Sequence, residues 1–184
     1  MLVVNLFAGS GARKSTTAVG VFHALQRKDI NCEFVTEYAK DLSYRGLLDL
    51  ARQNYKLRRL EGKVDVVITD SPILLPILYN KVYSHNKHLN DFIIYIFNRY
   101  DNMNYFLKKA KKCNSTEEEA MELDIEIKSL LDFNQTEEEA KKLDIKVKSL
   151  LDLCNVDYTE IEYNAYTVDI ITDNIIRRVD NASS

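Results

Sequence analysis

The feature that most constrains the fold is a short apolar run, followed at once by a glycine-containing turn and an amphipathic segment. Leu2–Phe7 is the apolar run, and over Lys14–Lys28 apolar residues recur at helical spacing. This order predicts a buried strand, a tight loop and a helix. Such a unit directs backbone N–H groups and the positive end of the helix dipole toward one point. The start of the chain is therefore expected to bind an anion.

The loop partly matches the pattern G-x-x-x-x-G-K-[ST], in which a glycine-rich turn holds nucleotide phosphates. Lys14 and Ser15 supply the lysine and the hydroxyl. Lys14 would reach the β- and γ-phosphates, and the Ser15 hydroxyl would coordinate Mg²⁺. The residues expected to bind the nucleotide are Gly9, Ser10, Gly11, Ala12, Arg13, Lys14, Ser15 and Thr16. We therefore expect ATP and Mg²⁺ as cofactors; the alternative is a simple turn before an amphipathic helix.

The two framing glycines of that pattern are replaced by Ala8 and Arg13. A methyl group at Ala8 is a small change. Arg13 is a larger one, because glycine at that position removes the steric limits on a backbone that approaches phosphate. Either Arg13 adds a positive charge to the phosphate site, or it blocks tight wrapping and leaves a weak or inactive enzyme.

Two carboxylates follow the second and third expected strands. Asp70 comes directly after Val64–Thr69, and Glu37 follows Cys32–Val35. Ligands of open α/β sheets bind beyond the carboxyl ends of strands, which places both residues at the expected site. Asp70 is a candidate Mg²⁺ ligand, or alternatively the cap of the following helix. Glu37 is a candidate base for an acceptor hydroxyl, or alternatively a solvated strand-end residue.

The remaining apolar runs alternate between strand and helix patterns, which predicts an α/β fold: a doubly wound parallel sheet with helices on both faces. The length of 184 residues fits one domain over 1–184. Helical spacing also runs from Leu47 toward Leu60, where Gly62 stops it. The later expected elements are strands at Asn104–Leu107 and Tyr158–Glu162 and a final helix near Val168–Val179.

Residues 114–133 and 134–153 form a tandem repeat with fourteen identities in twenty positions. Each copy opens with T-x-x-E, Thr116 with Glu119 and Thr136 with Glu139, which is the capping-box arrangement of a helix start. One copy is expected to belong to the fold and the other to be an added helix, as a lid or an insertion. The second copy is the better candidate for packing on the sheet, because it runs directly into the final strand.

The segments FAGSGARKSTTA, VTEYAKDL and VVITDSP, in this order, resemble the small P-loop kinase-like ATPases encoded by bacteriophages. They are similar to the nicotinamide riboside kinase domain and, more remotely, to deoxynucleoside kinases. The resemblance implies that Glu37 acts as base on a nucleoside 5′-hydroxyl, that Asp70 is the acid ending the third strand, and that Gln53 reads the acceptor base. It also implies an arginine-containing lid, for which this chain has only Lys108, Lys109, Lys111 and Lys112 before the repeat.

Composition excludes several function classes. A formal net charge of −3 gives no basic surface for nucleic acid, and no apolar run is long enough to span a membrane. Three separated cysteines predict reduced thiols and a cytoplasmic protein, in the host cytoplasm if a phage encodes it.

Two functions remain open after these exclusions. The first is ATP-dependent phosphoryl transfer to a nucleoside, nucleotide or ribosyl hydroxyl, with Lys14, Glu37 and Asp70 as catalytic residues. The second is a catalytically weak or inactive nucleotide-binding module that acts through a protein partner. The repeat helices are the candidate surface for such a partner or for a homodimer.

Overall fold

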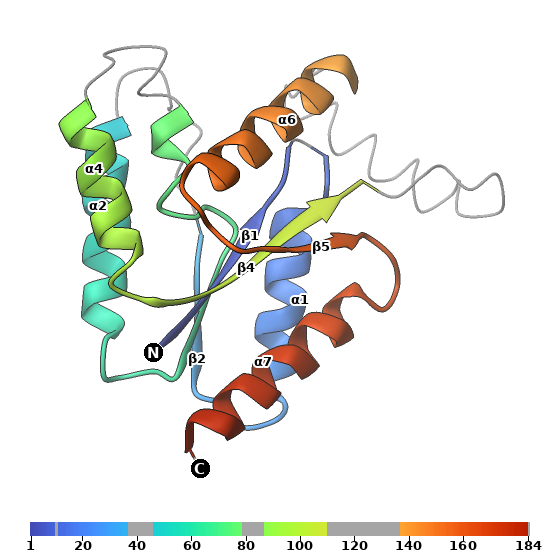
Figure 1. Ribbon diagram of the computed structural model, residues 1–184. Coiled ribbons are helices and arrows are strands. Elements are labelled where there is room, and N and C mark those ends of the chain that lie inside the picture. The colour runs from blue at the N-terminus through green and yellow to red at the C-terminus, as the bar shows by residue number, and fades with distance from the viewer. Residues whose placement is uncertain (10, 37–45, 79–86, 110–136, 184) are drawn as a thin grey trace, which may run out of the picture.

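The computed structural model describes residues 1–9, 11–36, 46–78, 87–109 and 137–183, and strands and helices alternate along them (Figure 1). The strands are β1 (Leu2–Phe7), β2 (Cys32–Val35), β3 (Val66–Thr69), β4 (Asp101–Lys108) and β5 (Thr159–Glu162). The principal helices are α1 (Lys14–Gln26), α2 (Gly46–Leu60), α4 (Lys87–Phe97), α6 (Glu137–Leu153) and α7 (Thr167–Ser183).

The described strands form one parallel sheet in the order β2-β3-β1-β4-β5. β1 is its central strand, and all six of its residues are buried, as expected for a parallel strand covered on both faces. Its register aligns Leu2 with Val66 of β3 and with Asp101 of β4. The α/β fold with a parallel sheet expected from the sequence is confirmed.

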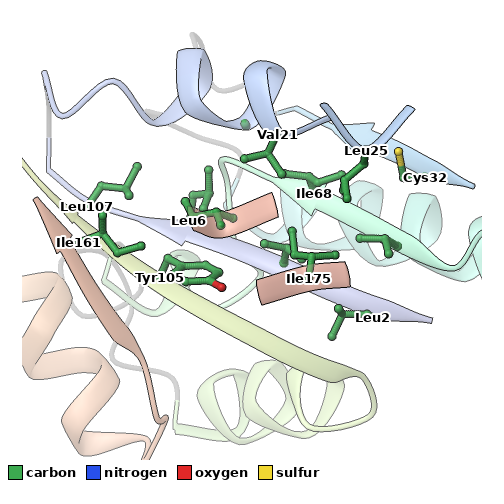
Figure 2. Packing of buried hydrophobic residues seen from close by; sticks show 14 of the residues in the cluster. Leu2, Leu6, Val21, Leu25, Cys32, Ile68, Tyr105, Leu107, Ile161 and Ile175 are labelled. Carbon is green, nitrogen blue, oxygen red and sulfur yellow. The ribbon is translucent and has the colours of Figure 1, made fainter. Parts of the chain in front are cut away.

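One face of the sheet is covered by α1 and α7. Figure 2 shows the apolar layer between them and the strands, with Leu6, Ile68 and Tyr105 on the sheet side and Val21 and Ile175 on the helix side. The two helices are in close contact, since a Cβ placed on Gly20 would lie 2.8 Å from Cγ2 of Val168. This layer fixes the start of α1, and with it the loop that follows β1.

The opposite face is covered by α2, α4 and α6 (Figure 1). α6 is the second copy of the repeat, and it contributes the buried residues Val147, Leu150 and Leu151 to this layer. The second copy therefore packs on the sheet, as expected. The first copy and both capping boxes lie outside the described residues.

β4 begins at Asp101, three residues earlier than the strand expected from the sequence. Asparagine is uncommon in strands, so the residues at the start of β4 did not show a strand pattern. Here Asn5 of β1 donates from Nδ2 to Oδ1 of Asn102 and of Asn104, at 2.9 Å in each case. The three asparagine side chains thus hydrogen-bond to one another across the adjacent strands β1 and β4.

No helix in the described ranges is both long and apolar enough to cross a membrane.

The contact between Gly20 and Val168 predicts a coupled effect on stability. In the wild-type background, Gly20→Ala should lower the free energy of unfolding, because overpacking costs about 1–3 kcal/mol and a valine in a helix has one preferred rotamer. In a Val168→Ala background the same change should raise that free energy, because alanine favours a helix over glycine by about 1 kcal/mol. Urea denaturation of the four proteins measures the difference. An equal effect in both backgrounds would contradict the contact.

Candidate nucleotide-binding site

The loop after β1 has the backbone form of an anion-binding turn. Gly11 and Arg13 both lie in the left-handed region, with φ of 79° and 56°. Such residues next to right-handed ones point successive N–H groups into one concavity. α1 begins at Lys14, and the side chain of Arg13, the residue before it, makes no capping hydrogen bond. The positive end of the helix dipole lies at this loop and favours negative charge there.

Lys14 lies across this loop. Its Nζ donates to the carbonyl oxygen of Ala8, at 2.9 Å. The ammonium group is thus held at the end of β1 by the loop's own backbone. A positive charge in this position, beside N–H groups at a helix start, suits the terminal phosphates of a nucleotide.

Ser15 and Asp70 come together at the same edge of the sheet. The Ser15 hydroxyl donates to Oδ2 of Asp70 at 2.5 Å. Asp70 is buried, and its other oxygen, Oδ1, has no hydrogen-bond partner among the described residues. A buried carboxylate oxygen without a donor is costly unless something else satisfies it. The pair is a suitable oxygen ligand set for Mg²⁺.

A metal ion of the Mg²⁺ type fits this pair. The described residues contain no cluster of three or more His, Cys, Asp or Glu side chains that could hold a metal by themselves. Mg²⁺ does not require one, because it usually keeps several waters and binds through one or two protein groups plus substrate phosphates. Ser15 and Asp70 are the protein groups that would hold it.

Arg13 packs its side chain on Tyr163. Its guanidinium carbon lies 5.2 Å from the ring centre of Tyr163, in the connection between β5 and α7. A left-handed backbone costs a residue with a side chain about 1–2 kcal/mol, which a cation–π contact of about 0.5–1 kcal/mol partly offsets. The loop thus keeps at Arg13 the backbone conformation that glycine adopts easily.

Asp144 is a contact of the loop that sequence reasoning missed. Its Oδ1 accepts the N–H of Gly9 at 2.5 Å, so α6 touches the loop directly. A Cβ on Gly9 would lie 2.8 Å from the carbonyl oxygen of Ala140, also in α6. Gly9 must therefore lack a side chain to leave room for this helix. The available signal was the repeat, since an aspartate stands beside the apolar face in both copies, at Asp124 and Asp144.

Gln53 lies close to the turn that carries Asp70. Its Nε2 donates to the carbonyl oxygen of Ser71 at 2.6 Å, so the α2 side chain supports this turn. Base recognition by Gln53 stays a prediction. Glu37 and Ser10 lie outside the described residues, and their positions in the site stay predictions as well.

The lysines expected to start a lid are only partly described. Lys108 pairs with Glu160 of β5, and Lys148 of α6 pairs with the same carboxylate. Hydrogen bonds from these two lysines hold the pKa of Glu160 below its usual value. Glu160 of β5 therefore connects β4 and α6 through these two lysines, and Lys111 and Lys112 fall outside the described ranges.

Comparison with known proteins supports the fold. No family model and no curated sequence matches the chain. Among solved structures, the YorR protein of Bacillus subtilis in complex with phosphorylated GDP is similar with a TM-score of 0.61 and 14% identity, over 97% of this chain and 95% of that chain. Thymidylate kinase of Ehrlichia chaffeensis is similar with a TM-score of 0.58 and 10% identity, over 97% of this chain and 98% of that chain. Deoxyadenosine kinase of M. mycoides, with dCMP and dCDP bound, is similar with a TM-score of 0.55 and 14% identity, over 95% of this chain and 99% of that chain. At these identities the similarity establishes that the chain has the fold of these three proteins.

Proposed function

We propose that this protein transfers the terminal phosphate of ATP to a nucleoside or nucleotide. The observation that carries the proposal is the Ser15–Asp70 pair, in which a loop hydroxyl and a buried carboxylate meet beside Lys14. Phosphoryl transfer requires mainly positioning and charge stabilisation, and these three groups supply both. The structural neighbours named for their action on deoxyadenosine and thymidylate make such acceptors the first to test.

Each residue has a distinct task in this proposal. The N–H groups at the start of α1 bind phosphate oxygens, and Lys14 turns from Ala8 to the transferred phosphate. Ser15 and Asp70 hold Mg²⁺, which when bound neutralises charge on the phosphates. Glu37 would accept the proton of the acceptor hydroxyl, and Gln53 would orient the acceptor through its position beside the Asp70 turn.

A nucleotide-binding module without turnover is the second candidate. Arg13 is the observation that favours it, because the loop there carries a side chain where the nucleotide-binding pattern has glycine. The two functions differ in one measurement. Incubation with Mg²⁺-ATP and a panel of nucleosides, nucleoside monophosphates and nicotinamide riboside yields ADP together with a phosphorylated acceptor only if the protein is a kinase.

Lys14→Ala should remove nucleotide binding. Mg²⁺-ATP should raise the melting temperature of the wild-type protein, because a ligand at about 100 times its Kd adds about 2.7 kcal/mol to the folded state. Lys14→Ala should show no such shift. The matched control is Lys63→Ala, an exposed lysine that precedes β3 at the opposite edge of the sheet, which should keep the full shift. An unchanged melting temperature of the wild type at millimolar ATP would exclude nucleotide binding.

Asp70→Asn should change the metal requirement. We expect the Mg²⁺ concentration for half-maximal turnover to rise by about tenfold or more, because a charged metal ligand is lost. Asp65→Asn, an exposed aspartate just before β3, is the control and should leave the requirement unchanged. Glu37→Gln should instead keep ATP binding and abolish turnover. Wild-type rates from both Asp70→Asn and Glu37→Gln would refute the assignment of these residues.

Arg13→Gly separates the two interpretations of the altered loop. Because the guanidinium lies over Tyr163 and the backbone is already left-handed, glycine should preserve nucleotide affinity within about twofold. Isothermal titration measures it, and Tyr163→Leu serves as a control that removes the ring contact but leaves the loop unchanged. A loss of tenfold or more in Arg13→Gly alone would show that Arg13 contacts the phosphates.

A further inference from the structure

α6 is held in place by contacts between Asp144 and Leu151. Asp144 accepts the N–H of Gly9, Leu150 and Leu151 are buried against the sheet, and Lys148 pairs with Glu160. Lys148 also lies 4.7 Å from the ring centre of Phe106 in β4. We call the surface that receives these side chains the α6 docking site; it is formed by Gly9, Phe106, Glu160 and the apolar layer on that face of the sheet.

Every residue that contacts this site has a counterpart twenty positions earlier in the chain. Leu143, Asp144, Val147, Lys148, Leu150 and Leu151 correspond to Leu123, Asp124, Ile127, Lys128, Leu130 and Leu131. Five of the six are identical, and the sixth exchanges valine for isoleucine. Residues 114–133 therefore carry a complete copy of the α6 docking face.

Four of the six positions that differ between the copies lie away from this face. Lys141, Lys142, Lys146 and Leu153 are exposed on α6, and they correspond to Met121, Glu122, Glu126 and Phe133. Of the other two differences, one is the isoleucine-for-valine exchange, and the last, at Gln135, falls outside the described residues. The sequence has thus diverged where α6 meets solvent and has been kept where it meets the sheet.

We propose that the α6 docking site accepts residues 114–133 of the same chain in place of α6. The docking contacts would be reproduced in kind, including the aspartate that accepts the N–H of Gly9. The chain would shift by one repeat at this site, so that residues 134–153 would become part of the connection that leads to β5. This makes the site an interaction surface for two interchangeable segments, independent of whether the protein transfers phosphate.

The connections allow this shift. Lys108 at the end of β4 and Lys148 in α6 pair with the same Glu160, so the end of β4 lies beside the second half of α6. The start of α6 lies eleven residues before Lys148, or about 17 Å along the helix axis. The eight residues 109–116 can span about 27 Å. With α6 docked, the long connection precedes the helix and the short one follows it; with residues 114–133 docked, the short connection comes first. The entropy cost of closing a loop grows slowly with its length, so this exchange costs little.

The turn that ends α6 favours the second copy at this site. Val156 donates its N–H to the carbonyl oxygen of Leu151 at 2.9 Å, and Asn155 turns the chain in the left-handed region, with φ of 50°. The first copy has Gln135 and Thr136 at these two positions. Gln135 stands at the position of Asn155, and glutamine adopts a left-handed turn less readily than asparagine, so the first copy would dock less tightly.

The test places a charge in each copy in turn. Leu151 is fully buried, so Leu151→Asp should expel α6 from its docking site. If residues 114–133 take its place, Leu151→Asp lowers the melting temperature by only a few degrees and unfolding stays cooperative. Leu131→Asp alone changes nothing, because α6 still occupies the site. The double variant Leu131→Asp/Leu151→Asp loses the cooperative transition.

Two further measurements make the result decisive. Hydrogen exchange of Leu151→Asp, or of the milder Leu151→Ala, should show protection lost over 137–153 and gained over 117–133. Ile175→Asp, in α7, has no repeated counterpart and should be equally damaging with and without Leu131→Asp. The proposal is overturned if Leu151→Asp is as unstable as the double variant. It is also overturned if hydrogen-exchange protection is not lost over 137–153 and gained over 117–133. It is also overturned if light scattering shows that rescue occurs only in a dimer, since the segment would then come from another copy.

Discussion

The parallel pairing of β1 with both β3 and β4 is the constraint on which the site depends. Since the three strands run in the same direction, their carboxyl ends meet at one edge of the sheet. The loop after β1 and the turn after β3 are therefore neighbours, which brings the Ser15 hydroxyl to the Asp70 carboxylate. Burial of β1 on both faces requires helices on each side, and α1 on one face is the helix that the loop enters. The fold and the candidate site thus have the same origin.

Local patterns predicted the parts of the structure that depend on neighbouring residues. The apolar run before the loop, the lysine–serine pair and the aspartate after a β-branched strand each showed in a few consecutive positions. Contacts between distant elements left no such trace. Asp144 against Gly9 and Gln53 against Ser71 join residues that no spacing relates, and the early start of β4 depends on asparagines that pair only across strands.

The unusual residues of the loop are accommodated by the C-terminal third of the chain. Arg13 packs its guanidinium on Tyr163 after β5, and Gly9 leaves room for α6. These contacts come from α6 and from the connection after β5, so the shape of the loop is set by elements that follow it by more than a hundred residues. A loop that departs from its usual sequence pattern can keep the backbone form of that pattern because later elements support it.

The asparagine pairs of the central strands also bear on the order of folding. A ribosome releases β1, β2 and β3 before β4, and until then β1 is the outer strand of a three-stranded sheet. Its partners Asn102 and Asn104 stand 97 and 99 residues away in sequence. During this interval Asn5 places a polar amide in the middle of an otherwise apolar strand. The amide makes β1 less apolar as an outer strand, and it gains Asn102 and Asn104 as hydrogen-bond partners only when β4 arrives.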